Sequence, residues 1–155
     1  MQEKLDDLDR KILKILEKDA KTVAKSIAEE LGLSKTPVYE RIKRLEHDGF
    51  IKKYVAILDK KKIGQSITVF SFVSLETQKG AMMDDFFRQV QNYPEVTECF
   101  VVGGDFDFLL KVVVQNLDAY YDFAKFKLAS LPIIGSVKSA FVLNEVKNDV
   151  VFPLL

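Results

Sequence analysis

The sequence predicts an α+β protein of two domains, in which three helices precede a unit of order β-α-β-β-α-β. Apolar residues recur at helical spacing through the first third of the chain, and strand-like segments rich in β-branched and aromatic residues dominate the rest. The charge divides in the same way. Residues 1–62 hold 16 Lys and Arg against 12 Asp and Glu, whereas residues 63–155 hold 7 against 11. We therefore expect two modules with different partners.

The first two helices follow from apolar periodicity. Apolar side chains at positions 8, 12, 15 and 16 predict a helix over residues 8–16 that is buried on one side. A second helix is predicted over residues 23–32, with Gly32 as its C-cap. Its inward residues are expected to be Val23, Ile27, Ala28 and Leu31.

The third helix is predicted to begin at the N-cap Ser34 and to end at Gly49. Pro37 is tolerated in its first turn, where backbone amides have no helical partner. The expected buried stripe is Val38, Ile42 and Leu45. A short Gly-Leu-Ser turn joins this helix to the second, which is the layout of a helix-turn-helix whose second helix enters the DNA major groove.

The outward side of the third helix carries the predicted DNA-binding residues. Those at its front are placed to meet base edges, and the later basic residues are suited to phosphates. The complete set is Ser34, Lys35, Thr36, Tyr39, Glu40, Arg41, Lys43 and Arg44. A plain three-helix bundle with a solvated charged face is the alternative interpretation. His47, the only histidine, is expected to be a surface residue.

A connecting region follows the helices. Residues 50–58 alternate apolar and basic side chains and predict a strand or an extended hinge, and the lysine-rich residues 59–66 predict a linker. The expected domains are therefore residues 1–58 with an exit strand, the linker 59–66, and residues 67–155.

The second domain is predicted to be ferredoxin-like, because its segments follow the order β-α-β-β-α-β. The expected ranges are 66–76, 81–91, 96–103, 107–114, 117–131 and 135–146. The two middle strands meet at Gly103–Asp107, which predicts a β-turn. Both faces of the strands are apolar: Phe106, Phe108 and Leu110 alternate with Leu109 in one strand. Because helices can cover only one face, the other face predicts a homodimer.

The sequence Gly-Gly-Asp-Phe-Asp at 103–107 has several interpretations. A catalytic aspartate pair would need a third group, and His47 lies in the other module. A metal loop would need more oxygen ligands. A phosphate cradle normally opens a helix, whereas this segment opens a strand. A structural turn is the base interpretation from the residues alone.

The composition restricts the remaining classes. The chain has 155 residues, no apolar run long enough to cross a bilayer, and a charged N-terminus that lacks the apolar centre of a signal peptide. Cys99 is the only cysteine, so no intrachain disulfide or thiolate metal site is expected. We expect a cytoplasmic protein without membrane contact, metal, cofactor or catalytic residues.

Four strings in order resemble the leucine-responsive regulator/AsnC (Lrp/AsnC, feast/famine) family of transcriptional regulators. They are LDDLDRKILKIL, LSKTPVYERIKRLEHDGFI, VVGGDFDFLLKV and SLPIIGSVKSAFVL. The resemblance implies a winged-type helix-turn-helix joined to an effector-sensing domain that dimerises sheet to sheet. Dimers of this family gather into tetramers, octamers or larger assemblies.

The resemblance also implies that an effector, usually an amino acid, binds between dimers. The implied effector-binding residues are Gly103, Gly104, Asp105, Phe106 and Asp107, with Ser136 and Ser139 nearby. Turn amides can donate to the carboxylate of an amino acid, and an aspartate can accept from its ammonium group. This chain has two glycines where many members have Thr or Ser before a single Gly-Asp, which leaves its ligand open.

The expected function is therefore a DNA-binding transcriptional regulator that responds to an amino acid or related effector. The alternative is an architectural DNA-organising oligomer without an effector. Some proteins that resemble this family are haem-pathway decarboxylases acting on tetrapyrroles. That chemistry calls for histidine and arginine in the second domain, which has Arg88 alone, so we expect no enzyme activity.

Overall fold

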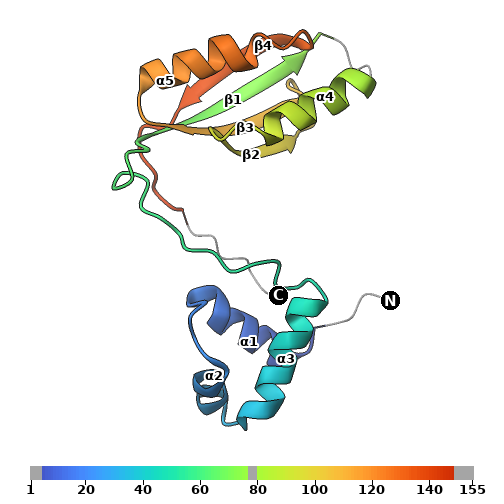
Figure 1. Ribbon diagram of the computed structural model, residues 1–155, viewed down its shortest axis with the longest axis vertical. Coiled ribbons are helices and arrows are strands. Elements are labelled where there is room, and N and C mark those ends of the chain that lie inside the picture. Colours follow the sequence, from blue (N-terminus) through green and yellow to red (C-terminus); the bar gives the residue numbers. More distant parts are fainter. Residues whose placement is uncertain (1–4, 77–79, 149–155) are drawn as a thin grey trace. The chain divides into compact units, whose positions relative to one another are not determined.

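The computed structural model describes residues 5–76 and 80–148. Between residues 5 and 146 the chain divides into two compact units, 5–57 and 58–146 (Figure 1). The unit boundary falls between Ile57 and Leu58. The last residues of the predicted second domain, 149–155, lie outside the described residues.

The first unit consists of three helices: α1 (Asp7–Lys18), α2 (Ala24–Leu31) and α3 (Lys35–His47). A capping box begins α1, because the Asp6 side chain accepts from the Asp9 amide and the Asp9 side chain accepts from the Asp6 amide. Gly32 ends α2 at φ 68°, the left-handed conformation of the predicted C-cap.

The core of the first unit contains the predicted stripe of α3. Its buried residues are Ile12, Leu16, Ile27, Ala28, Val38, Ile42 and Leu45. Burying one such aliphatic side chain contributes about 1.5–3 kcal/mol. The inward placement of Val23 was wrong: Val23 is the N-cap of α2, precedes the first helical turn, and is 61% exposed.

The exit strand predicted at 50–58 is absent from the structure. A strand needs a neighbour that pairs with its amides and carbonyls, and no strand of the described chain pairs with this segment. Several of its apolar side chains are exposed, namely Tyr54, Val55, Ile57 and Leu58. The segment therefore has no strand structure, which fits the extended connection that was the other interpretation of this pattern.

The second unit has the predicted ferredoxin-like order. Its elements are β1 (Ile67–Leu75), α4 (Gly80–Gln91), β2 (Val96–Val101), β3 (Phe108–Val114), α5 (Leu117–Asp122), the π-helix η1 (Phe123–Leu128) and β4 (Ile134–Phe141). The strands form one antiparallel sheet in the order β2-β3-β1-β4. The helix predicted at 117–131 changes to π-helical winding at Phe123, and the strand predicted at 135–146 ends at Phe141.

Helices α4 and α5 pack on one face of the sheet. The Phe86 ring of α4 lies 4.6 Å from the Phe108 ring of β3, and Tyr120 and Phe123 belong to the same core as Val69 and Val73. The opposite face is not covered by any described helix. Register places Phe100, Leu109, Phe72 and Lys138 in one row there, followed by a row of Glu98, Lys111, Phe70 and Ala140.

Phe106 does not share the face of Phe108, in contrast to the prediction. Strand β3 begins only at Phe108, so the alternation of faces does not extend back to Phe106. Its ring lies 5.1 Å from the ring of Phe72, on the uncovered side.

Candidate DNA-binding face and effector site

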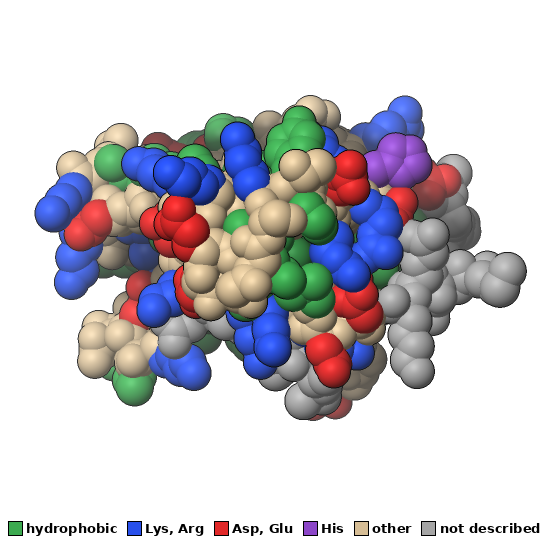
Figure 2. Space-filling model, turned by 90° about the horizontal axis from the view of Figure 1, so that it is seen from below, with side chains coloured by type: hydrophobic (Ala, Val, Ile, Leu, Met, Phe, Trp, Pro, Cys, Tyr) green, Lys and Arg blue, Asp and Glu red, His purple; other side chains and the backbone are tan. Residues whose placement is uncertain are grey.

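The predicted DNA-binding residues lie on the outward side of α3. Arg41 is half-buried, and the exposed members are Ser34, Lys35, Thr36, Tyr39, Glu40, Lys43 and Arg44. Ser34 occupies the N-cap position, although its side chain makes no capping hydrogen bond. In the space-filling view from below, basic side chains are interspersed with acidic ones (Figure 2). The predicted set on α3 likewise combines the acidic Glu40 with basic side chains.

The two arginines of α3 are paired with carboxylates of α1. Arg41 Nη1 lies 2.6 Å from Asp6 Oδ2 and 2.8 Å from Asp9 Oδ1, and Arg44 Nη2 lies 2.5 Å from Asp9 Oδ2. Asp9 is 1% exposed. The Asp9 amide and the Arg41 guanidinium lower the pKa of Asp6 to about 2. The carboxylates of Asp6 and Asp9 therefore fix the orientation of both arginine side chains. The spacing of residues in the sequence did not predict these ion pairs.

Lys43 has a local partner. Its Nζ lies 2.8 Å from Glu46 Oε2 and 5.8 Å from the centre of the Tyr39 ring. Glu46 raises the pKa of Lys43 and also accepts a hydrogen bond from Tyr54. The Lys43–Glu46 pair is exposed and contributes little to stability. Lys35, at the front of the helix, makes no ion pair with a described residue.

The turn between β2 and β3 is fastened to β1 by Asp107. The Val102 amide donates to the Asp107 carbonyl at 3.0 Å, and the Asp107 amide donates to the Val73 carbonyl at 2.9 Å. The Asp107 carboxylate accepts from the Leu75 amide at 2.8 Å. Asp107 is therefore a structural residue of the turn, whereas Asp105 is exposed.

The tip of the turn borders open space. Gly104 has φ 130°, which L side chains rarely adopt, and a Cβ built at Gly103 or Gly104 meets nothing within 4 Å. Phe106 packs on Phe72, and Lys138 Nζ lies 5.3 Å from the centre of the Phe106 ring. The turn thus combines exposed glycine backbone with an aromatic floor.

Register brings only one of the two predicted serines near the turn. Ser136 pairs with Ser74, whose hydroxyl donates to the Asp105 carbonyl at 3.5 Å. Ser139 lies further along β4, and its hydroxyl is bonded to the Tyr120 hydroxyl, which also meets Ser71 at 2.9 Å. Ser139 therefore serves the packing of α5 on the sheet.

Two residues near the turn were missed by sequence reasoning, Ser74 and Lys138. Both lie on strands that pair with each other, and the antiparallel register that sets the end of β1 beside the start of β4 could have indicated them.

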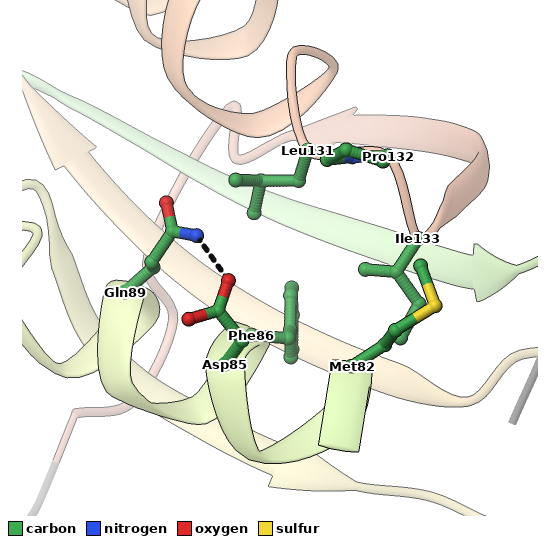
Figure 3. Close-up of a pocket in the computed structure, with 7 residues that line it drawn as sticks. All are labelled: Met82, Asp85, Phe86, Gln89, Leu131, Pro132 and Ile133. Carbon is green, nitrogen blue, oxygen red and sulfur yellow. Dashed lines mark hydrogen bonds between the residues drawn. The ribbon is translucent and has the colours of Figure 1, made fainter. Parts of the chain in front are cut away.

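A pocket of about 200 Å³ lies between α4 and the segment before β4 (Figure 3). Its floor is mostly apolar, and Gln89 Nε2 donates to Asp85 Oδ2 at 2.8 Å at its side (Figure 3). The lining residues are Met82, Asp85, Phe86, Gln89, Leu131, Pro132 and Ile133. The sequence pattern did not single out this pocket.

Within residues 5–76 and 80–148, no three or more His, Cys, Asp and Glu side chains form a group that could hold a metal ion. No helix in the described part of the chain has the length and apolar character needed to cross a membrane.

Comparison with known families decides what the two units are. Residues 5–52 match a winged helix-turn-helix DNA-binding domain, and residues 68–152 match the Lrp/AsnC ligand binding domain. The chain belongs to the Lrp/AsnC family. A Bkd operon transcriptional regulator from Pseudomonas aeruginosa is 39% identical over 142 residues, covering 92% of this chain and 93% of that protein. The leucine-responsive regulatory protein of Escherichia coli is 37% identical over 145 residues, covering 94% and 88%.

Solved Lrp/AsnC structures share the whole fold. An AsnC family regulator from Agrobacterium tumefaciens has a TM-score of 0.92 at 38% identity, with 97% of each chain covered. A transcriptional regulator from Neisseria meningitidis, solved as a complex with L-methionine, has a TM-score of 0.93 at 31% identity and the same coverage. This Lrp/AsnC protein is a DNA-binding transcriptional regulator with an effector-binding second domain. Its similarity to regulators agrees with the expectation that it is not an enzyme.

Proposed function

We propose that this regulator acts in the cytoplasm, binds promoter DNA through α3, and responds to an amino acid at the turn of residues 103–107. The effector proposal rests on the different surroundings of the two aspartates of this turn. Asp107 is bonded to β1, while the exposed Asp105 and the glycine backbone border open space. An effector can therefore be bound without dismantling the turn.

The chemistry of the turn suits an α-amino acid. Backbone amides of Gly103 and Gly104 can donate to a carboxylate, and the Asp105 carboxylate can accept from an ammonium group. The hydroxyls of Ser74 and Ser136 supply further polar groups, and the Phe72–Phe106 pair favours an apolar side chain. The L-methionine complex of the Neisseria regulator supports this ligand class.

The uncovered face of the sheet supports a homodimer through this domain. Phe72, Leu109 and Phe100 form an apolar row, and Phe100 is 47% exposed. Burial against a second copy would remove this apolar surface from water. We propose that such dimers assemble into tetramers or octamers, with the effector bound between dimers. Binding would then bias assembly, and assembly would bias the spacing of α3 helices on DNA.

On DNA, we propose that the front of α3 reads base edges and its later basic residues contact phosphates. Lys35, Thr36, Tyr39 and Glu40 are the base-edge candidates, and Arg41, Lys43 and Arg44 are the phosphate candidates. Half-sites about 34 Å apart are expected for a dimer.

A thermal-shift screen of the twenty amino acids, followed by sizing of the assembly with each hit, tests the effector proposal. A ligand at one hundred times its Kd stabilises by about 2.7 kcal/mol, and we expect an apolar amino acid to do so and to change the assembly size. Asp105→Asn should abolish the shift, whereas the exposed Asp118→Asn on α5 should preserve it. If no amino acid stabilises the protein, the architectural alternative gains support.

Competition between the protein's own promoter region and random DNA at moderate salt tests the DNA proposal. We expect the promoter to be preferred. Lys43→Ala, which removes a phosphate candidate, should weaken binding to all sequences and reduce the salt slope by about 1, and Lys14→Ala on α1 is the matched control. A wild-type protein with no preference for its promoter would contradict the proposal.

A further inference from the structure

Asp9 is a buried carboxylate that two arginines of the recognition helix share. Its Oδ1 lies 2.8 Å from Arg41 Nη1 and its Oδ2 lies 2.5 Å from Arg44 Nη2. The Asp9 side chain is 1% exposed, whereas those of Arg41 and Arg44 are 30% and 47% exposed. A carboxylate in the core of the domain therefore holds two cations that reach the surface.

The N-terminus of α1 holds Asp9 in place in turn. The Asp6 amide donates to Asp9 Oδ2, and the Asp9 amide donates to Asp6 Oδ1 at 2.7 Å. Asp6 Oδ2 also accepts from Arg41 Nη1 at 2.6 Å. Both oxygens of Asp9 thus have hydrogen-bond donors, and the carboxylate has little freedom to turn.

Stability alone is a weak explanation for this arrangement. The cost of desolvating a buried ion pair offsets most of its attraction, and apolar replacements are often neutral or stabilising. An exposed guanidinium without a partner, by contrast, samples many rotamers, and fixing it removes side-chain entropy before any ligand binds. The main effect of the Asp9 contacts is therefore to restrict the rotamers of Arg41 and Arg44, and their net contribution to the stability of the core is small.

The geometry leaves both arginines able to bind an anion. The contacts with Asp6 and Asp9 use Nη1 of Arg41 and Nη2 of Arg44, and a guanidinium carries five N–H donors in a rigid fork. Arg41 and Arg44 line an open depression on α3 together with Pro37 and Glu40. Two oriented guanidinium groups one helical turn apart suit the oxygens of a nucleic-acid phosphate.

The charge balance adds a second effect. Asp6 and Asp9 together neutralise the two arginines, so the pair attracts DNA less at long range than two unpaired arginines would. Sequence-independent binding depends on such charge, whereas specific binding depends on register on the duplex. A carboxylate that orients the arginines while reducing their net charge would favour specific over indiscriminate binding.

We propose that Asp9 is a positioning residue for DNA recognition, which fixes Arg41 and Arg44 as a phosphate-binding pair and restrains their indiscriminate attraction to DNA. This inference rests on the proposed binding of DNA by α3. It assigns to α1, outside the recognition helix, a role in the specificity of the regulator.

The test compares Asp9→Asn with Asp7→Asn in the full chain. Asp7 is exposed in the same helical turn of α1, so its substitution makes the same charge change without touching the arginines. Affinities for the promoter region and for random DNA are measured across a salt series, and the folded fraction is measured by circular dichroism. For Asp9→Asn we expect tighter binding to random DNA, a salt slope steeper by about 1, and a promoter preference reduced at least about tenfold.

The outcomes separate the inference from its alternatives. Equal promoter preference in the Asp9→Asn and Asp7→Asn proteins would overturn it, as would parallel loss of both affinities in proportion to the folded fraction. If Asp9→Asn does not fold, Asp6→Asn decides, because Asp6 is 49% exposed and its loss still releases one contact of Arg41. An unchanged preference in that variant would also overturn the inference. A wild-type protein without promoter preference would instead refute the proposed function.

Discussion

The carboxylate of Asp107 accepts a hydrogen bond at 2.8 Å from the backbone amide of Leu75, 32 residues earlier in the chain. This bond joins the turn after β2 to the end of β1. It also distinguishes two aspartates that look equivalent in the sequence, since Asp105 makes no such side-chain bond with a described residue.

Alanine substitutions should separate the roles of these aspartates. Asp107→Ala leaves the Leu75 amide without its charged acceptor and should lower the free energy of unfolding by about 1–3 kcal/mol. Asp105→Ala should change it by less than about 0.5 kcal/mol while removing stabilisation by the effector. Urea unfolding with and without ligand measures both effects, and the reverse ranking of stabilities would contradict the structure.

The two adjacent glycines should differ in their tolerance of a side chain. Gly104 has φ 130°, and an added Cβ meets no neighbour, so the cost of Gly104→Ala is backbone strain of about 1–3 kcal/mol. Gly103 has no positive φ, so Gly103→Ala should cost little. Thermal unfolding of both variants checks this difference, and equal melting temperatures would show that the turn relaxes.

A charge on the uncovered sheet face should dissociate the proposed dimer. Phe100→Asp would bury an unpaired carboxylate in the interface and should weaken dimerisation about 100-fold or more. Phe126→Asp is the matched control, because Phe126 is 62% exposed on η1, away from this face. Analytical ultracentrifugation measures the association; dissociation by both variants, or by neither, would argue against this interface.

The Asp6 carboxylate should make stability depend on acid pH. Its pKa in the folded protein is about 2, below the ordinary 3.8, so the charged form stabilises the fold above pH 3.8 and this contribution disappears as pH falls through about 2. Asp6→Asn keeps an N-cap but loses the charge. The variant should be less stable than wild type at pH 7 and approach it between pH 4 and 2. A stability difference that stays constant over this range would show that Asp6 is not the titrating group.

Much of the fold was predictable because it follows from local pattern. The stripe of Val38, Ile42 and Leu45 repeats at helical spacing, and all three residues are buried. The order of strands and helices in the second unit likewise identified its topology. By contrast, π-helical winding at 123–128 was not predictable, because the apolar spacing there suits an ordinary helix.

The site was less predictable because its contacts join distant parts of the chain. The prediction that Arg41 and Arg44 contact phosphates did not include their partner Asp9, which lies 32 and 35 residues earlier in the chain. Phe106 was assigned to the wrong face because the alternation of β3 was extended into the turn. The hydrogen bond between Ser139 and Tyr120 was not predicted, because apolar periodicity gives only the approximate position of the helix that carries Tyr120. Exposure of α3 residues, in contrast, followed directly from the buried stripe.

The hydroxyl chain of Ser71, Tyr120 and Ser139 has an evolutionary consequence. Ser71 is fully buried, so Tyr120→Phe alone would leave the Ser71 hydroxyl without a partner. Joint replacement of Tyr120 and Ser71 by apolar residues would leave only the exposed Ser139 hydroxyl, which water can satisfy. Replacement of Ser71 alone leaves the Tyr120 hydroxyl bonded to Ser139, so in a laboratory lineage selected only for retained folding Ser71 should change before Tyr120 or together with it.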